Sequence, residues 1–250
     1  IIWEEGQPLG QGECVSGPSR GGEEPESRLT SREVPEPASA RERTRGAREA
    51  REAREASLPD HVLPHCPDAR KLASITSPPM AEIVEAILEP SQNWMTEQLV
   101  HVLGLELGNE GSWEEGFRVE EMFLTETVGV DSLDIHFRDG SGLSAYNLVT
   151  PRAMVRILEF MKEGPHGQIF RNALAEPGEE DSTLERRLEG MEGRVFGKTG
   201  TISHVNALSG YLVTRSGREL IFSILTNGSG LPSGAVRAGI DRVVRVAARR

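Results

Sequence analysis

The chain of 250 residues carries a formal net charge of −11, and 37% of its residues are hydrophobic. This length is sufficient to bury a sizeable core. The acidic balance argues against a nucleic-acid or anionic-membrane partner. The sequence contains no apolar run of about 18 residues that would predict a transmembrane helix.

Composition divides the chain into two parts. Residues 1–71 are rich in Glu, Arg, Pro, Gly and Ser, and we expect this low-complexity segment to be disordered or translated out of frame. Its opening residues, Ile-Ile-Trp-Glu-Glu, do not have the pattern expected of a secretory signal peptide. Cys14 and Cys66 lie in this segment and predict no disulfide framework, and His61, His65 and Cys66 lack the second cluster that a zinc site requires.

The first half of residues 72–250 is predicted to be mainly helical. An amphipathic helix begins after Pro79, and a second helix starts at Ser91, whose hydroxyl is expected to cap it, and ends near Gly104. A third helix is expected over residues 112–128. These helices have apolar stripes that require a partner surface.

A short strand over residues 134–138 leads into a turn-rich segment, and Thr150 then caps a helix that begins with Pro151. Three strand-like runs and a closing helix follow, over residues 195–201, 207–214, 219–226 and 235–248, with Ser216-Gly217 as a hairpin turn. This order predicts an α+β fold in which helices pack on an antiparallel sheet.

The tripeptide Lys198-Thr199-Gly200 lies within the first of these strands. The ammonium of Lys198 and the hydroxyl of Thr199 are suited to hold a C-terminal carboxylate, and Gly200 lets a peptide approach the strand edge closely. Surface strands also contain this tripeptide by chance, so its meaning depends on the surrounding motifs.

Two further segments carry neighbouring serine and asparagine side chains. Ser144 and Asn147 end the glycine-rich stretch 139–147, which is also explained as a turn that leads into a helix cap. Residues 90–99 follow the pattern Ser-x-Asn-x-x-x-Glu-Gln-Leu, but a capped amphipathic helix gives the same pattern, and we interpret this segment as structural.

In their order along the chain these segments resemble the C-terminal half of the D-alanyl-D-alanine carboxypeptidase/endopeptidase family, the low-molecular-mass class C penicillin-binding proteins. Residues 203–212 also resemble this family. The resemblance implies a partial penicillin-binding-protein or β-lactamase-like transpeptidase fold over residues 72–250. It further implies peptidoglycan stem peptides and β-lactams as ligands, an extracytoplasmic location, and no metal or cofactor.

The resemblance also implies a role for each matched residue. Lys198 and Thr199 bind the substrate carboxylate, and the Thr201 N–H provides one arm of an oxyanion hole. Ser144 relays a proton, and Asn147 orients the peptide. We therefore expect the Lys198 Nζ to lie within roughly 5 to 6 Å of the Ser144 or Asn147 side chain.

The family's nucleophile motif, Ser-x-x-Lys, is absent from the sequence. In that motif a lysine one helical turn after a serine activates the serine hydroxyl. The three lysines are preceded three positions earlier by other residues: Lys71 by Asp68, Lys162 by Glu159 and Lys198 by Val195. Three hypotheses stay open: a family member that cannot acylate alone, a non-catalytic module that binds peptidoglycan peptides, and a decayed fragment without activity.

Overall fold

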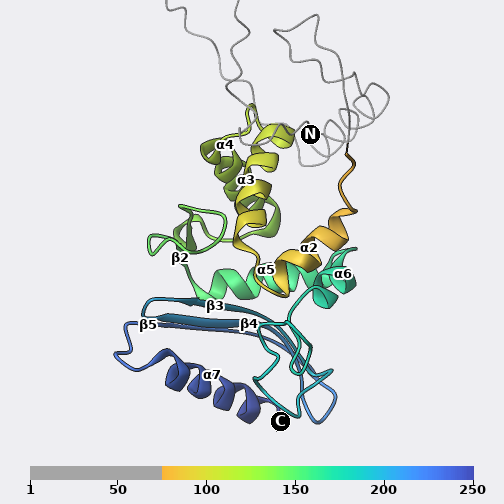
Figure 1. The fold of residues 1–250 in the computed structure, drawn as a ribbon, viewed down its shortest axis with the longest axis vertical. Coiled ribbons are helices and arrows are strands. Elements are labelled where there is room, and N and C mark those ends of the chain that lie inside the picture. The colour runs from red at the N-terminus through yellow and green to blue at the C-terminus, as the bar shows by residue number, and fades with distance from the viewer. Residues whose placement is uncertain (1–74) are drawn as a thin grey trace, which may run out of the picture. The chain divides into compact units, whose positions relative to one another are not determined.

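The structure, a computed structural model, describes residues 75–250, and Pro78–Arg250 form one compact unit (Figure 1). The low-complexity segment, with its cysteines and the nearby histidines, lies outside the described residues. The elements in chain order are α2 (Met80–Leu88), α3 (Asn93–Leu107), α4 (Trp113–Met122), η1 (Phe123–Val128), η2 (Ser132–Asp134), β1 (Ile135–His136), β2 (Leu148–Val149), α5 (Pro151–Glu163), α6 (Gly167–Asn172), β3 (Val195–Ile202), β4 (Val205–Val213), β5 (Glu219–Asn227) and α7 (Ser233–Ala247). Within residues 75–250, every helix is too short or too polar to cross a bilayer.

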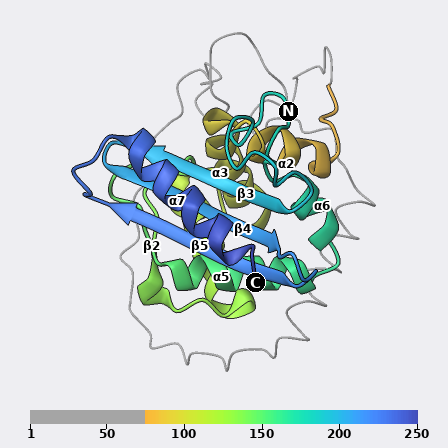
Figure 2. The ribbon, with the colours of Figure 1, turned by 90° about the horizontal axis from the view of Figure 1, so that it is seen from below.

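The three long strands form an antiparallel meander in the order β3-β4-β5. Figures 1 and 2 show α7 along one face of this sheet and α5 along the other. The strands hydrogen-bond without interruption from Val195 opposite Leu212 to Ile202 opposite Val205. The predicted α+β fold, with helices packed on an antiparallel sheet, is confirmed.

Alternation along β4 sends its side chains into two separate cores. Leu208 and Leu212 are fully buried against the apolar stripe of α7. Tyr211 points to the opposite face, where it is buried beside Leu158 of α5 and donates a hydrogen bond from its hydroxyl to the Leu158 carbonyl at 2.7 Å. Each face of the sheet is therefore covered by its own helical layer.

Strand register places the Lys198 side chain on the α5 face of the sheet. Lys198 on β3 lies opposite Ser209 on β4, and residues directly opposite each other in an antiparallel pair share a face. Ser209 has the same parity as Tyr211, which faces α5. Lys198 therefore points toward the layer that contains α2, α3 and α5.

Of two residues predicted to cap helices, Thr150 and Ser91, only Thr150 does so. Thr150 caps α5 as expected, because its side chain accepts a hydrogen bond from Ala153 N at 3.2 Å and Pro151 begins the helix. Ser91 does not cap α3: the N-cap is Gln92, and no side-chain hydrogen bond caps this helix. The prediction of Ser91 as a helix cap is wrong, and its hydroxyl has a different partner.

Other boundaries differ from the sequence prediction for local reasons. The helix predicted over residues 112–128 is α4 followed by the π-helical turn η1. The strand predicted over residues 134–138 is reduced to the two residues of β1. Arg138 N and Asp139 N both donate to Asn147 Oδ1 instead of continuing a strand ladder.

Glu120 on α4 provides a test of the packing around this helix. Burial, and secondarily the charge of Glu121, raises the pKa of the Glu120 carboxyl to about 7. The folded chain therefore keeps a proton that the unfolded chain loses near pH ~4.3, so this carboxyl lowers stability as the pH rises from about 4.5 to 7.

We predict that Glu120→Gln removes this part of the pH dependence and raises the free energy of unfolding at pH 8 by about 1 to 2 kcal/mol. Urea unfolding at pH 5 and at pH 8 measures both effects. The control is Glu114→Gln on the exposed side of the same helix, which should leave the dependence unchanged. Identical pH profiles for Glu120→Gln and the unmodified chain would contradict the prediction.

Candidate active site

Two hydrogen bonds hold the Lys198 ammonium. Its Nζ donates to Ser91 Oγ at 2.7 Å and to the backbone carbonyl of Thr199 at 2.9 Å. Burial lowers the pKa of the Lys198 ammonium to about 8. None of the ion pairs formed within residues 75–250 includes Lys198. Because an ammonium has three donors, one N–H remains for an incoming acceptor.

Ser91 lies at the corner between α2 and α3. Gln92 N donates to Ile87 O at 2.9 Å, and this hydrogen bond closes the corner. The backbone of Ser91 has a φ of 65°, in the left-handed region that residues with a Cβ seldom adopt. Such a conformation persists where the surrounding structure holds it, and here the Ser91 hydroxyl reaches the Lys198 ammonium.

The outer edge of β3 is open beyond Gly197. Within the described residues, the partner on this side is Ala175, whose carbonyl accepts a hydrogen bond from Gly197 N at 2.9 Å. Alternate residues of an antiparallel strand direct their N–H and C=O groups to the same side. Thr199 and Thr201 therefore direct theirs to the open edge. This edge is suited to pair with an extended peptide.

Ser144 and Asn147 belong to a loop that is held by its own side chains. Asp139 Oδ1 accepts a hydrogen bond from Asn147 Nδ2 at 2.7 Å, and the same carboxylate accepts from Ser144 N. Ser144 Oγ in turn accepts from Tyr146 N at 3.2 Å. None of these hydrogen bonds reaches Lys198, so the assignment of Ser144 and Asn147 to the site stays a prediction.

The residue that the sequence interpretation missed is Ser91. The family that the sequence resembles usually has a Ser-x-Asn motif. Ser91-Gln92-Asn93 has this spacing, whereas Ser144 and Asn147 are one residue further apart. This spacing is the signal that identifies Ser91. A helix cap imitates the same pattern, and only the hydrogen bond to Lys198 distinguishes the two interpretations.

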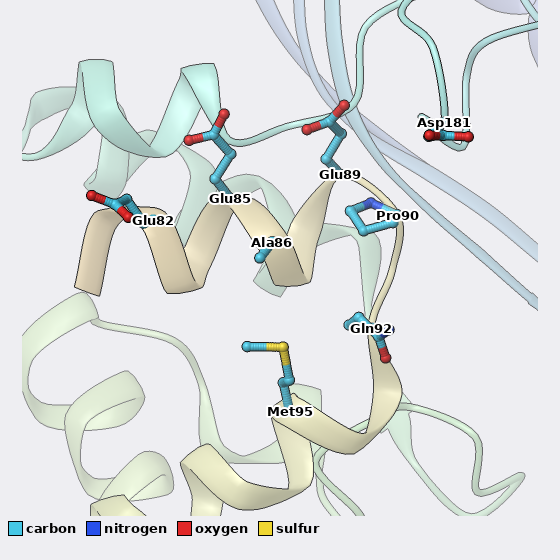
Figure 3. A pocket seen from close by; sticks show the side chains of 8 residues that line it. All are labelled: Glu82, Glu85, Ala86, Glu89, Pro90, Gln92, Met95 and Asp181. Atoms are coloured by element: carbon cyan, nitrogen blue, oxygen red, sulfur yellow. The ribbon is translucent and has the colours of Figure 1, made fainter. Parts of the chain in front are cut away.

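A cavity of about 500 Å³ lies beside Ser91 and is lined by its neighbours Pro90 and Gln92 (Figure 3). Figure 3 shows Glu89 near the end of α2 and Asp181 from another loop among the other lining residues. Burial and the neighbouring carboxylates raise the pKa of Glu89. The cavity next to Ser91 is therefore lined by acidic side chains, and Lys198 is not among its lining residues. Within residues 75–250, no group of His, Cys, Asp and Glu side chains is arranged to hold a metal ion.

The sequence matches the D-Ala-D-Ala carboxypeptidase 3 (S13) family over residues 61–250. The chain belongs to this family. Its Lys-Thr-Gly strand, Ser-x-Asn corner and Asp139 loop all lie within the matched part. The suspected relationship to D-Ala-D-Ala carboxypeptidases is therefore confirmed.

The chain is also similar to a named relative and to two solved structures. D-alanyl-D-alanine carboxypeptidase from Actinomadura sp. is 40% identical over 172 residues, which are 66% of this chain and 32% of that protein. Penicillin binding protein 4 from Haemophilus influenzae, solved with a β-lactam, has a TM-score of 0.58 at 21% identity, covering 68% of this chain and 40% of that chain. A class A β-lactamase from Bacteroides cellulosilyticus has a TM-score of 0.50 at 17% identity, covering 68% of this chain and 64% of that chain.

These neighbours confirm the penicillin-binding-protein and β-lactamase-like fold. The chain spans about a third of the Actinomadura carboxypeptidase and two fifths of the Haemophilus protein.

The contact between Ser91 and Lys198 in this S13 chain predicts a measurable pKa change. Ser91→Ala removes an acceptor of the ammonium while the lysine stays partly buried, so the pKa of Lys198 should fall by about half a unit or more. NMR titration of the Lys198 side chain measures this pKa. Ser144→Ala is the matched control and should leave it unchanged; a larger shift for Ser144→Ala would restore the original assignment.

Proposed function

We propose that this S13 family member recognises peptidoglycan stem peptides that end in D-Ala-D-Ala and that it does not acylate by itself. The observation that supports this proposal is the hydrogen bond between Lys198 and Ser91 beside the open edge of β3. Lys198 supplies a partly buried cation and Ser91 supplies a hydroxyl, next to a strand whose outer edge carries unpaired N–H and C=O groups.

In the proposed complex the peptide lies in an extended conformation along the β3 edge. The remaining donor of the Lys198 ammonium and the Thr199 hydroxyl hold the terminal carboxylate, because charge-assisted hydrogen bonds are the strongest available to such a group. The Thr201 N–H, which is directed to the same edge, would stabilise the oxygen of the scissile carbonyl. Carboxylate recognition and peptide alignment thus use neighbouring residues of one strand.

Ser91 takes the role of proton relay in this proposal, in place of Ser144. Its hydroxyl is hydrogen-bonded to an ammonium whose pKa is about 8, so a proton can pass between the two groups near neutral pH. Asn93, two residues later at the start of α3, is the amide that the Ser-x-Asn motif provides to orient the peptide. Neither role requires Asn147.

Acylation requires a further group. Serine acyl transfer needs a hydroxyl activated by an adjacent base, and the sequence has no Ser-x-x-Lys. The second N–H of the oxyanion hole would come from that same serine in the family. We infer that the chain binds D-Ala-D-Ala peptides and β-lactams non-covalently, in an extracytoplasmic setting, and that a decayed fragment without affinity is the alternative.

The missing nucleophile gives a direct prediction. The purified chain should form no covalent adduct with a fluorescent penicillin, because no serine in it is paired with a lysine one helical turn later. Denaturing gel electrophoresis with fluorescence detection measures the adduct. A labelled band would show that another serine acts as the nucleophile, and repeating the reaction with Ser91→Ala would show whether it is Ser91.

Carboxylate recognition is tested by peptide binding. An N-acylated peptide ending in D-Ala-D-Ala should bind at pH 7, and Lys198→Met should weaken binding by about tenfold or more because a charge-assisted contact is lost. Binding should also weaken as the pH rises above about 8, where the ammonium loses its proton. Isothermal calorimetry measures both effects.

Two controls separate recognition from non-specific binding. Lys162 on α5 forms an ion pair with Glu219 on β5. Lys162→Met removes this lysine and should leave the affinity for the peptide unchanged. The same peptide with a C-terminal amide lacks the carboxylate and should bind as weakly to the unmodified chain as the acid does to Lys198→Met. Equal affinity for the acid and the amide would exclude the proposed mode, and no affinity for either would favour the decayed fragment.

A further inference from the structure

Glu97 joins α3 to the loop that contains Ser144. One of its carboxylate oxygens accepts a hydrogen bond from Gly140 N at 3.0 Å, and the other accepts from Ser141 N at 2.9 Å. Both hydrogen bonds are partly buried, and carboxylates bind backbone N–H groups more strongly than neutral acceptors do. The side chain thus acts as a two-point clamp between the helix and the loop.

The loop lies directly on the first turns of α3. A Cβ atom added to Gly140 would lie 2.6 Å from Val100 Cγ2 and 2.9 Å from the Thr96 carbonyl, so only glycine permits this approach. Within α3, Thr96 Oγ1 donates to the Asn93 carbonyl at 2.6 Å, which links the contact surface to the first residue of the helix. The loop therefore supports the beginning of α3.

The loop is rigid enough to provide this support. Asp139 accepts hydrogen bonds from Gly142 N at 2.7 Å and from Asn147 Nδ2 at 2.7 Å, which close the loop on itself. At its end, Thr150 N donates to the Asp134 carbonyl at 3.0 Å, beside the pairing of β1 with β2. A clamp attached to such a loop restrains the helix that it holds.

The restrained segment is the one that presents Ser91. Ser91 precedes α3 by two residues, and its left-handed backbone persists only if the chain on both sides is held. On the α2 side the corner is closed by the hydrogen bond from Gln92 N to Ile87 O. On the α3 side, Glu97 attaches the start of the helix to the loop through its hydrogen bonds from Gly140 N and Ser141 N.

We propose that Glu97 is a positioning residue of the site: by clamping the Gly140–Ser141 backbone it fixes the start of α3 and so holds the Ser91 hydroxyl against the Lys198 ammonium. The proposal rests on the proposed function, because it assigns Glu97 to the Ser91–Lys198 pair. Glu97 itself contacts neither residue through its side chain in the hydrogen bonds of residues 75–250. Its effect on Lys198 therefore passes through α3.

A double-mutant cycle tests this coupling. Glu97→Gln keeps the shape of the side chain but replaces one acceptor oxygen with an N–H₂ group, so one of the two backbone hydrogen bonds is lost. In the unmodified chain Ser91→Ala should lower the pKa of Lys198 by about half a unit or more. In the Glu97→Gln chain the same substitution should change this pKa by less than about half as much, because Ser91 is no longer held against the ammonium.

The readouts are NMR titration of Lys198 and amide hydrogen exchange at Gly140 and Ser141, which should become at least about tenfold faster in Glu97→Gln. Glu114→Gln, an exposed glutamate on α4, is the matched control and should change neither quantity. Equal effects of Ser91→Ala in both backgrounds would limit Glu97 to a structural role and overturn the inference. If Ser91→Ala never changes the pKa of Lys198, the proposed function fails as well, and the single-mutant arm identifies that case.

Discussion

The hydrogen bond between Lys198 Nζ and Ser91 Oγ joins the sheet to the corner between α2 and α3, across 107 residues of sequence. It depends on the strand register that directs Lys198 to the α5 face, and on the corner that directs Ser91 toward the sheet. Burial at this contact also shifts the ammonium pKa into the range where it can exchange a proton. In the proposed function, recognition of a carboxylate and transfer of a proton share this one interaction.

The two faces of the sheet differ in polarity. Leu208 and Leu212 pack with α7 in an apolar core. The opposite face accommodates Lys198 together with Tyr211, whose hydroxyl is satisfied by the Leu158 carbonyl. A polar site is compatible with a stable sheet here because the apolar core on the α7 side does not depend on it.

Features that arise from local chemistry could be predicted from the sequence. Alternation and turn residues identified the three strands of the meander, and Thr150 followed by Pro151 identified the start of α5. The role of Ser91 could not be predicted locally, because a helix cap and a catalytic Ser-x-Asn motif share one pattern and the deciding partner is far away in sequence. The contact of Glu97 with Gly140 could not be predicted either, because its partner lies 43 residues later in the sequence.

The left-handed backbone of Ser91 bears on which residue suits this position. Glycine adopts this conformation without steric cost, and asparagine tolerates it better than serine does. Exchanging Ser91 for glycine would therefore relieve backbone strain of the order of 1 kcal/mol, but it would also remove the hydroxyl that accepts a hydrogen bond from Lys198. Relief of the backbone strain favours glycine at this position, whereas the contact with Lys198 favours serine.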